Sequence, residues 1–440
     1  MSDTIEDGAH VASAADVPGR APRVLQYLGI GVVGVATVAA ALHLGRPLLS
    51  DPGGRSLAVL PFADLSARGD QGYLADGVAE DLLTHLSRVP GLRLVSRTSV
   101  IRYRDSDEPV PTIAEELGVD YLLEGSVRRD GDRIRITAQL IHAGSDAHLW
   151  AESYDRRIGD LFRVQGDIAT AIGRELQLRL SEGERRRLET PPTDDLAAYD
   201  EFLRGRDLYH RLKRDANEAA IGHFRRAIER DPDFALAHAW LGAAFAARRH
   251  RYGGAAAWLD SARLAAGRSL DVDPDLPDGH RVLGTVQMTS GRLREGARSL
   301  ERALELNPND WAAAGNLGTV YGRLGRLDEA VALYRAVATG DPVLAMPARI
   351  NLGVTYTTLG LHERAEAELR AALALAPDNR FSRGGLARLL ARRGRMSEAA
   401  ALADTLLAEN PGDPGALSVA AEIFLAAGRR HRALDVLREL

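Results

Sequence analysis

The sequence predicts a chain in three parts: one membrane helix, a small α/β domain and an array of paired helices. Three observations predict this fold class, α/β plus all-α. Residues 24–44 contain no Asp, Glu, Lys or Arg, residues 56–190 mix short strands with helices, and prolines recur about every 34 residues in the region 195–440. We expect a disordered tail at 1–23 and a linker at 45–55.

The composition excludes several functional classes. The chain has 56 Lys and Arg against 61 Asp and Glu, a net charge of −5, so its surface lacks the basic field that holds a phosphate backbone and we expect no nucleic-acid partner. The absence of Cys excludes disulfides, thiolate metal sites and Cys nucleophiles. Lys213 is the single lysine, which removes phosphate loops of the GK[ST] type and kinase-type lysines elsewhere in the chain.

The stretch from Val24 to Leu44 is 21 residues long, and as a helix it would span about 30 Å, the thickness of a bilayer core. It contains a GxGxxG pattern at Gly29–Gly34, but the residues that follow are apolar on every face. A dinucleotide loop leads into an amphipathic helix, so we expect no cofactor here. A cleaved signal peptide is the alternative; the length of the run and the 23 residues before it favour a retained anchor.

The α/β region contains a turn signal at Asp130-Gly131-Asp132 and strict alternation from Arg133 to Leu140, so one face of that strand should meet the core. Asp81 and His85 stand four residues apart on a helix and could share a metal or a proton. With no third ligand, we expect a solvated pair and no metal. The expected strands are 56–62, 92–96, 119–127, 133–142 and 147–154, and the expected helices are 76–89, 111–117 and about 160–187.

Four blocks in this region carry a family resemblance: SLAVLPFADLS, YLADGVAEDLLTHLSRVPGLRLVSRTS, AEELGVDYLLEGSVRRDGDRIRITAQLI and AHLWAESYDR. In this order they resemble the TolB amino-terminal-like domain over residues 56–182. That family is not catalytic, and the resemblance implies a role in binding a protein or a small ligand. Its members are commonly fused to adenylate cyclases, serine/threonine kinases or winged-helix regulators.

Regulators of the CadC type are similar in plan, with a cytoplasmic output domain, one membrane helix and a periplasmic sensory region. This chain departs from that plan, because only 23 residues precede the expected helix and no output domain fits there. The resemblance implies a single-pass protein of the inner membrane with the bulk of the chain in the periplasm. Arginines balance on the two sides of the helix, so the positive-inside rule adds little to this expectation.

The region 195–440 resembles the tetratricopeptide repeat. The matching residues are the Leu-Gly-x-x-Tyr runs at 317–321 and 352–356, followed in the first case by Ala330, Tyr334 and Pro342. Small residues are needed where the two helices of a unit pack closely, and the proline ends the second helix. We expect about six and a half units at 201–234, 235–276, 277–310, 311–345, 346–379, 380–413 and 414–440.

Repeats of this kind bind extended peptides or helices in a groove lined by the first helix of each unit. The resemblance implies groove positions at Arg281, Asn316, Asn351 and Arg388, a row that could clamp a peptide backbone or an acidic peptide. An alternative stays open for the two asparagines, which could instead satisfy backbone groups between repeats.

We expect a membrane-anchored, non-enzymatic scaffold that binds protein or peptide partners. The alternative is the sensory half of a signalling system whose cyclase, kinase or transcriptional output is on another chain. The final unit lacks a polar capping helix and exposes Leu434 and Leu437, so we expect this end to fray, or a partner or a second copy to cover it. Cover by a second copy would make a homo-oligomer.

Reporter fusions after Leu440 test the expected topology. Alkaline phosphatase should be active and green fluorescent protein should stay dark, because the first folds only in the periplasm and the second fluoresces only in the cytoplasm. A bright fluorophore with inactive phosphatase would place both domains in the cytoplasm and contradict the expectation.

Overall fold

The computed structural model describes residues 55–89, 91–178, 181–182 and 190–440, which belong to one compact unit. The predicted tail, the predicted membrane helix at 24–44 and nearly all of the linker lie outside these residues. Within the described ranges, no helix combines the length and the apolar character that a bilayer crossing requires.

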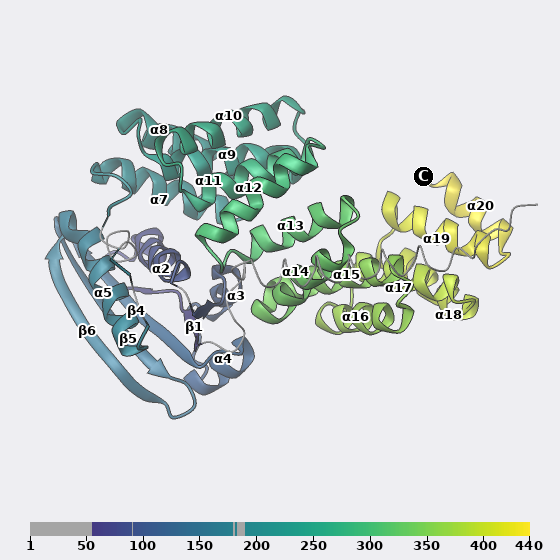
Figure 1. Cartoon of the computed structure of the whole chain (residues 1–440), viewed down its shortest axis with the longest axis horizontal. Helices are drawn as coiled ribbons and strands as arrows, with labels where there is room; N and C mark the ends of the chain where they lie inside the picture. Colours follow the sequence, from purple (N-terminus) through teal and green to yellow (C-terminus); the bar gives the residue numbers. More distant parts are fainter. Residues whose placement is uncertain (1–54, 90, 179–180, 183–189) are drawn as a thin grey trace, which may run out of the picture. The chain divides into compact units, whose positions relative to one another are not determined.

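The α/β domain is built on a sheet with the strand order β3-β1-β4-β5-β6, and β2 lies beside β4 (Figure 1). Strand β1 runs parallel to both β3 and β4, whereas β4, β5 and β6 form an antiparallel meander. The hairpin between β4 and β5 turns at Gly131, as the sequence predicted. The strands are β1 (Arg55–Val59), β2 (Ala63–Asp64), β3 (Leu92–Leu94), β4 (Tyr121–Asp130), β5 (Arg133–His142) and β6 (Ala147–Arg157).

Helices cover both faces of the sheet. Alternate residues of β1 explain this arrangement, because Leu57 and Val59 join the core under one pair of helices while Ala58 and Leu60 join the core under the other. The first pair is α2 (Gly72–Ser87) and α5 (Leu161–Glu175), and the second is α3 (Arg97–Val100) and α4 (Val110–Leu117). Two 3-10 turns, η1 (Ile101–Tyr103) and η2 (Ile158–Asp160), complete the domain.

Two helix boundaries differ from the predictions. Helix α2 begins at Gly72, so Asp76 lies inside the helix rather than at its start. Helix α5 ends at Glu175 rather than near 187, because Gln177 has φ +52° and Leu178 N donates to Gly173 O at 2.8 Å. This arrangement closes the helix end, and it was missed because glycine is the usual residue at such a position.

The remaining residues form seven helix pairs. The first pair begins at Leu196 rather than 201, because the Asp195 carboxylate accepts hydrogen bonds from Ala197 N and Ala198 N and caps the helix. The pairs are α7 (Leu196–His210) with α8 (Arg214–Arg230), α9 (Ala235–His250) with α10 (Ala257–Val272), α11 (Pro277–Thr289) with α12 (Leu293–Leu306), α13 (Trp311–Arg323) with α14 (Leu327–Gly340), α15 (Pro342–Thr358) with α16 (His362–Leu375), α17 (Arg380–Arg392) with α18 (Met396–Glu409), and α19 (Pro414–Ala426) with α20 (Arg430–Arg438).

The recurring small residues lie where the sequence predicted close packing. A Cβ added to Gly318 would lie 2.7 Å from the ring of Tyr334, and one added to Gly353 would lie 2.5 Å from Leu369. Gly325, in the turn between the two helices of a pair, has φ +79°, a conformation that a residue with a side chain rarely adopts. These positions therefore set the spacing of the helices and the direction of the turn.

The α/β domain and the first repeats share one hydrophobic core. A single cluster of buried side chains runs from the α2 and α5 side of the sheet into the first three pairs and ends at Val286. A second cluster begins at Ala297 and continues through the later pairs to Val436.

The edge strand β3 is closed by the turn that precedes α13. Asn309 accepts a hydrogen bond from Leu94 N at 3.0 Å and donates to Leu92 O and Ser87 O, each at 2.9 Å, while Trp311 Nε1 donates to Leu94 O at 2.8 Å. One side-chain amide thus bonds the exposed backbone of β3 as a neighbouring strand would.

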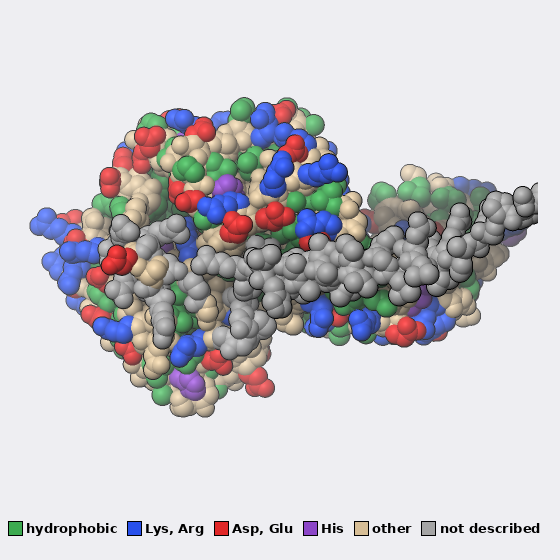
Figure 2. All heavy atoms as spheres, in the orientation of Figure 1, with side chains coloured by type: hydrophobic (Ala, Val, Ile, Leu, Met, Phe, Trp, Pro, Cys, Tyr) green, Lys and Arg blue, Asp and Glu red, His purple; other side chains and the backbone are tan. Residues whose placement is uncertain are grey.

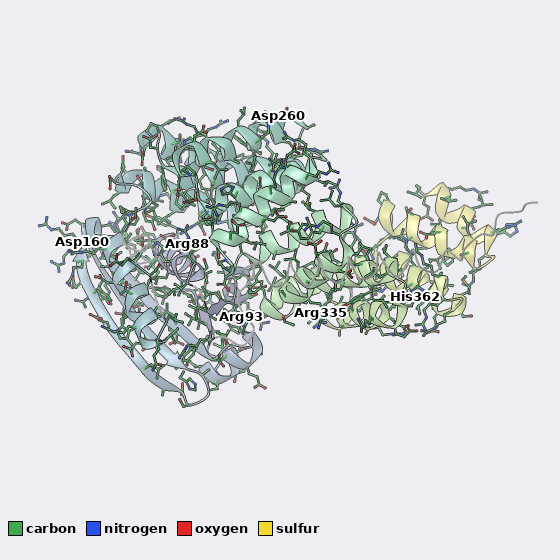
Figure 3. All side chains as sticks on the ribbon, in the orientation of Figure 1. Arg88, Arg93, Asp160, Asp260, Arg335 and His362 are labelled. Atoms are coloured by element: carbon green, nitrogen blue, oxygen red, sulfur yellow. The ribbon has the colours of Figure 1, made fainter. Side chains whose placement is uncertain are left out.

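The turn before α15 makes a second contact with the same side of the domain. The Asp341 carboxylate accepts from Ser96 N and from Ser99 Oγ, each at 2.9 Å, while it also caps α15. Arg93 lies at this boundary, where it donates to Gly340 O at 3.2 Å (Figure 3). The α/β domain is therefore held to the array by hydrogen bonds as well as by the shared core.

Asn309→Asp should loosen β3. The variant keeps the acceptor for Leu94 N but turns a second acceptor toward two backbone carbonyls, which costs about 2 kcal/mol. Hydrogen exchange across β3 should then be roughly 30-fold faster, since 1.4 kcal/mol corresponds to a factor of about ten.

Asp378→Asn is the matched control, because Asp378 occupies the equivalent turn before α17 and is exposed. It should leave exchange in β3 unchanged. Equal exchange in both variants would show that the Asn309 amide does not close the strand edge.

Candidate protein-binding groove

The four predicted groove residues lie on the first helices of four different pairs, on α11, α13, α15 and α17. We call the side of the array that carries them the groove face. Among the described residues, no hydrogen bond or ion pair joins any two of the four. They are therefore separate positions along a surface rather than one polar cluster.

Arg281 is held by its own chain. Its Nη2 lies 2.8 Å from Asp278 Oδ1, and its Nε lies 3.1 Å from Asp310 Oδ2 at the start of the next pair. Burial lowers the pKa of this arginine, but the two carboxylates outweigh burial and raise it above its ordinary value. Arg281 thus ties α11 to α13.

The side chains of the other three residues differ in their hydrogen-bond and ion-pair partners. Asn316 Nδ2 donates to Thr285 Oγ1 at 3.0 Å, so this asparagine bridges two pairs through a side chain rather than through the backbone groups of the alternative interpretation. Arg388 Nε lies 2.8 Å from Glu422 Oε2 at an exposed position on the next pair. The side chain of Asn351 is half-buried and makes no hydrogen bond with the described residues, while its backbone carbonyl accepts one from Thr355 Oγ1.

The groove face of the first pair is occupied by the α/β domain. Gly205 packs against Phe224 as Gly318 packs against Tyr334, so Leu203 is the counterpart of Asn316, two residues before the glycine. A Cβ added to Gly77 of α2 would lie 2.7 Å from Leu203, and Arg206 Nη2 donates to Gly77 O at 3.0 Å. Helix α2 therefore lies directly against the groove face of α7.

Buried charges join these two helices. Glu80 of α2 lies 3.3 Å from Arg206, 3.2 Å from His210 and 3.3 Å from Arg97. Burial would raise the pKa of Glu80, but Arg206, His210 and Arg97 outweigh it and hold that pKa well below its ordinary value of 4.5. Because a buried charge is costly without a partner, each member of this group fixes the position of the others.

The expectation of a solvated pair at Asp81 and His85 is wrong. Asp81 is 8% exposed and bonds Arg206 at 2.8 Å, Gln165 at 3.1 Å and the hydroxyl of Tyr199. Burial lowers the pKa of His85 to about 4, although Asp81 opposes the shift. A helix that docks on a neighbour buries both of its sides, and spacing within the helix does not reveal this.

Beyond α11 the groove face carries exposed apolar side chains. Val354, Phe381 and Leu425 are 53%, 61% and 51% exposed. When the repeats are aligned on the small residue of each unit, Val354 corresponds to Arg206 of α7, Phe381 to Tyr199 and Leu425 to Tyr209. Gly315 and Gly322 of α13 have open space where a Cβ would lie. Counting from the small residue of each unit, which is Gly318, Gly353, Ala387 or Ala421, would have identified these positions in the sequence.

The part of the repeats that is visible in Figure 2 carries charges of both signs. Figure 2 shows Lys and Arg interspersed with Asp and Glu over most of the visible repeats. Many of these charges pair within the array, as Arg349 does with Glu368 at 2.7 Å. The groove face thus offers apolar contact area and small residues rather than an unbalanced charge.

Family models match three parts of the chain. A tetratricopeptide repeat model matches residues 209–269 and 281–345, and a second matches 356–423. A model described as the second domain of HilA/YgeH-like transcriptional regulators matches residues 53–170, which include most of the α/β domain. The helix pairs are therefore tetratricopeptide repeats, as the sequence predicted, whereas the TolB-like assignment stays a resemblance.

Three relatives show the range of similar proteins. "Putative adenylate cyclase 3" from Rhizobium meliloti (strain 1021) is 38% identical over 246 residues, which are 56% of this chain and 42% of that protein. "Cellulose synthase operon protein C" from Xanthomonas axonopodis pv. citri (strain 306) is 30% identical over 186 residues, 41% of this chain and 12% of that protein. The solved structure of PilW, a "widely conserved type IV pilus biogenesis factor", has a TM-score of 0.44 at 15% identity and covers 51% of this chain and 99% of its own. The chain spans less than half the length of these two curated relatives.

Acid should destabilise the α/β domain through His85 of α2. The unfolded chain takes up a proton near the ordinary histidine pKa of 6.5, whereas the buried side chain does so only near 4. The stabilisation is therefore complete above pH 6.5 and is lost as the pH falls toward 4, a change of about 3 kcal/mol at most. Glu80 adds a further loss below its ordinary pKa of 4.5.

The melting midpoint, followed by circular dichroism at several pH values, measures this dependence. His85→Leu should flatten the curve between pH 6.5 and 4, and His431→Leu at an exposed position should leave it unchanged. An unaltered curve for His85→Leu would mean that this histidine does not couple folding to pH.

Proposed function

We propose that this protein is a membrane-anchored, non-enzymatic adaptor that captures a protein or peptide partner on the groove face of its repeats. The observation that carries the proposal is the seating of α2 on α7. Within one molecule, the first pair already holds a helix on its groove face, through Leu203 and Arg206. The later pairs present the equivalent positions without an occupant from the described residues.

The proposed partner presents an apolar face, and its backbone can approach the repeats closely. Val354, Phe381 and Leu425 supply apolar contact, while Gly315 and Gly322 let a partner helix or strand approach α13 closely. Asn351 of α15 and Arg388 of α17 add hydrogen-bond donors on the same face of the array. Such a mixture suits a segment that carries apolar anchors and polar flanks.

The anchor is the apolar stretch 24–44, and its length supports a single membrane crossing. The resemblance to TolB-like sensory regions supports a location on the outer side of the inner membrane. The α/β domain is then the part that sets how the array is presented, because it shares a core with the first three pairs.

A second function is favoured by the comparisons. A relative named as a putative adenylate cyclase and a family model named for transcriptional regulators both cover regions of this chain. In this alternative the chain is the sensory half of a signalling system whose output is on a separate protein. Deletion of the gene would then change a signalling output rather than the assembly of the cell envelope.

A photo-cross-linking residue in place of Phe381 tests the proposed groove. It should form discrete adducts with a partner in cells, because the side chain is 61% exposed on the groove face. The same probe in place of Leu264, which is exposed on α10 away from the groove face, should not.

Val354→Glu should lower the adduct yield at position 381 by about tenfold, since it places a charge in an apolar contact worth roughly 1.4 kcal/mol or more. Alanine at Asn351 and Arg388 together should lower it as well, and circular dichroism should remain unchanged. Alanine at Arg281 is unsuitable here, because it would leave Asp310 without its partner. Equal adduct yields from the probes at positions 381 and 264 would contradict the assignment of the groove face as the binding surface.

A further inference from the structure

The outermost strand of the sheet has an open edge. Strand β6 contains 11 residues and pairs on one side with β5, and within the described residues no strand pairs with its other side (Figure 1). Proteins usually shorten such edges or protect them with proline, charged side chains or a bulge. In β6 the one irregularity is a bulge at Leu149, so the stretch from Trp150 to Arg157 is regular.

The hydrogen bonds show which backbone groups are free. Ile158 N donates to Asp132 O at 2.7 Å, and the neighbours of these residues, Arg157 and Arg133, face each other in the register. Because the direction of the N–H and C=O groups alternates along an antiparallel strand, Arg156, Tyr154 and Glu152 bond β5. The backbone groups of Ala151, Ser153, Asp155 and Arg157 therefore point away from the sheet.

We propose that two copies of this chain associate through β6, antiparallel, with Tyr154 opposite Tyr154 of the second copy. Glu152 and Arg156 lie on either side of Tyr154 on one face of the strand, and both are exposed. This register sets Glu152 opposite Arg156 of the other copy, and the symmetry makes the pair twice. Centring the contact on Glu152 or on Arg156 would instead set like charges opposite each other, which is unfavourable.

The surroundings of β6 fit this arrangement. Figure 2 shows basic side chains gathered at the end of β6 that leads into η2. An antiparallel contact separates the two basic ends, whereas a parallel contact would bring them together. Helix α5 contacts both β5 and β6, so the two copies of α5 would lie about two strand spacings apart, ~10 Å, an ordinary distance between packed helices.

The mass of the full chain in detergent, from sedimentation velocity over a range of concentrations, tests the proposal. The unaltered protein should be a dimer. Glu152→Arg and Arg156→Glu should each weaken the dimer by about tenfold or more, because each replaces two attractive pairs by two repulsive ones. The double variant should restore it, and circular dichroism should be the same for all four proteins.

Ser153→Pro gives an independent measurement. It removes a backbone N–H that points away from β5, so it should abolish the dimer and leave the β5–β6 ladder intact. A monomeric unaltered protein would overturn the proposal, as would a dimer that Glu152→Arg does not weaken. A dimer lost only in Leu434→Glu with Leu437→Glu would place the contact on α20, where both leucines are exposed.

Discussion

The buried ion pairs between α2 and α7 are the interaction on which the rest of the structure depends. Arg206 lies in the interior with Glu80 and Asp81, and all three side chains are nearly inaccessible to water. Removing one partner would leave a buried charge uncompensated, a cost of roughly 3–5 kcal/mol. The same contact joins the core of the sheet to the core of the first repeats, so these two regions are a single folding unit despite their different architectures.

Much of the fold could be predicted, because it depends on local patterns. The alternation from Arg133 to Leu140 located a strand, and the recurring Leu-Gly pairs located the repeats. Both patterns can be recognised because the period of a strand or of a repeat is visible in the local sequence. The end of α5 was missed because Gln177 adopts a conformation that favours glycine. The membrane helix and the TolB-like character of the α/β domain stay predictions.

The candidate site was harder to predict than the fold. The repeat pattern identifies the positions of the groove face, but it does not show which of them other parts of the chain already use. Arg281 forms an ion pair that links two helix pairs, and α2 covers the groove-face positions of α7. The contact between α2 and α7 joins residues more than a hundred positions apart, as Gly77 and Arg206 are, and no local period encodes it. The face that we propose for partner binding is consequently shorter than the array.

The closure of β3 by Asn309 fixes how the architecture can change during evolution. Five helices, α8 to α12, lie between the docking contact on α7 and the turn that carries Asn309. Gain or loss of a pair in this interval would displace Asn309 from the strand while α7 stayed in place, so both attachments could not form at once. Beyond the first turn of α15, where Val343 N donates to Ser99 Oγ, no hydrogen bond among the described residues joins the array to the α/β domain. Repeats there can be duplicated, deleted or exchanged without disturbing that domain. The number of repeats is thus constrained in the first part of the array. In the second part it can vary, and the range of proposed partners can vary with it.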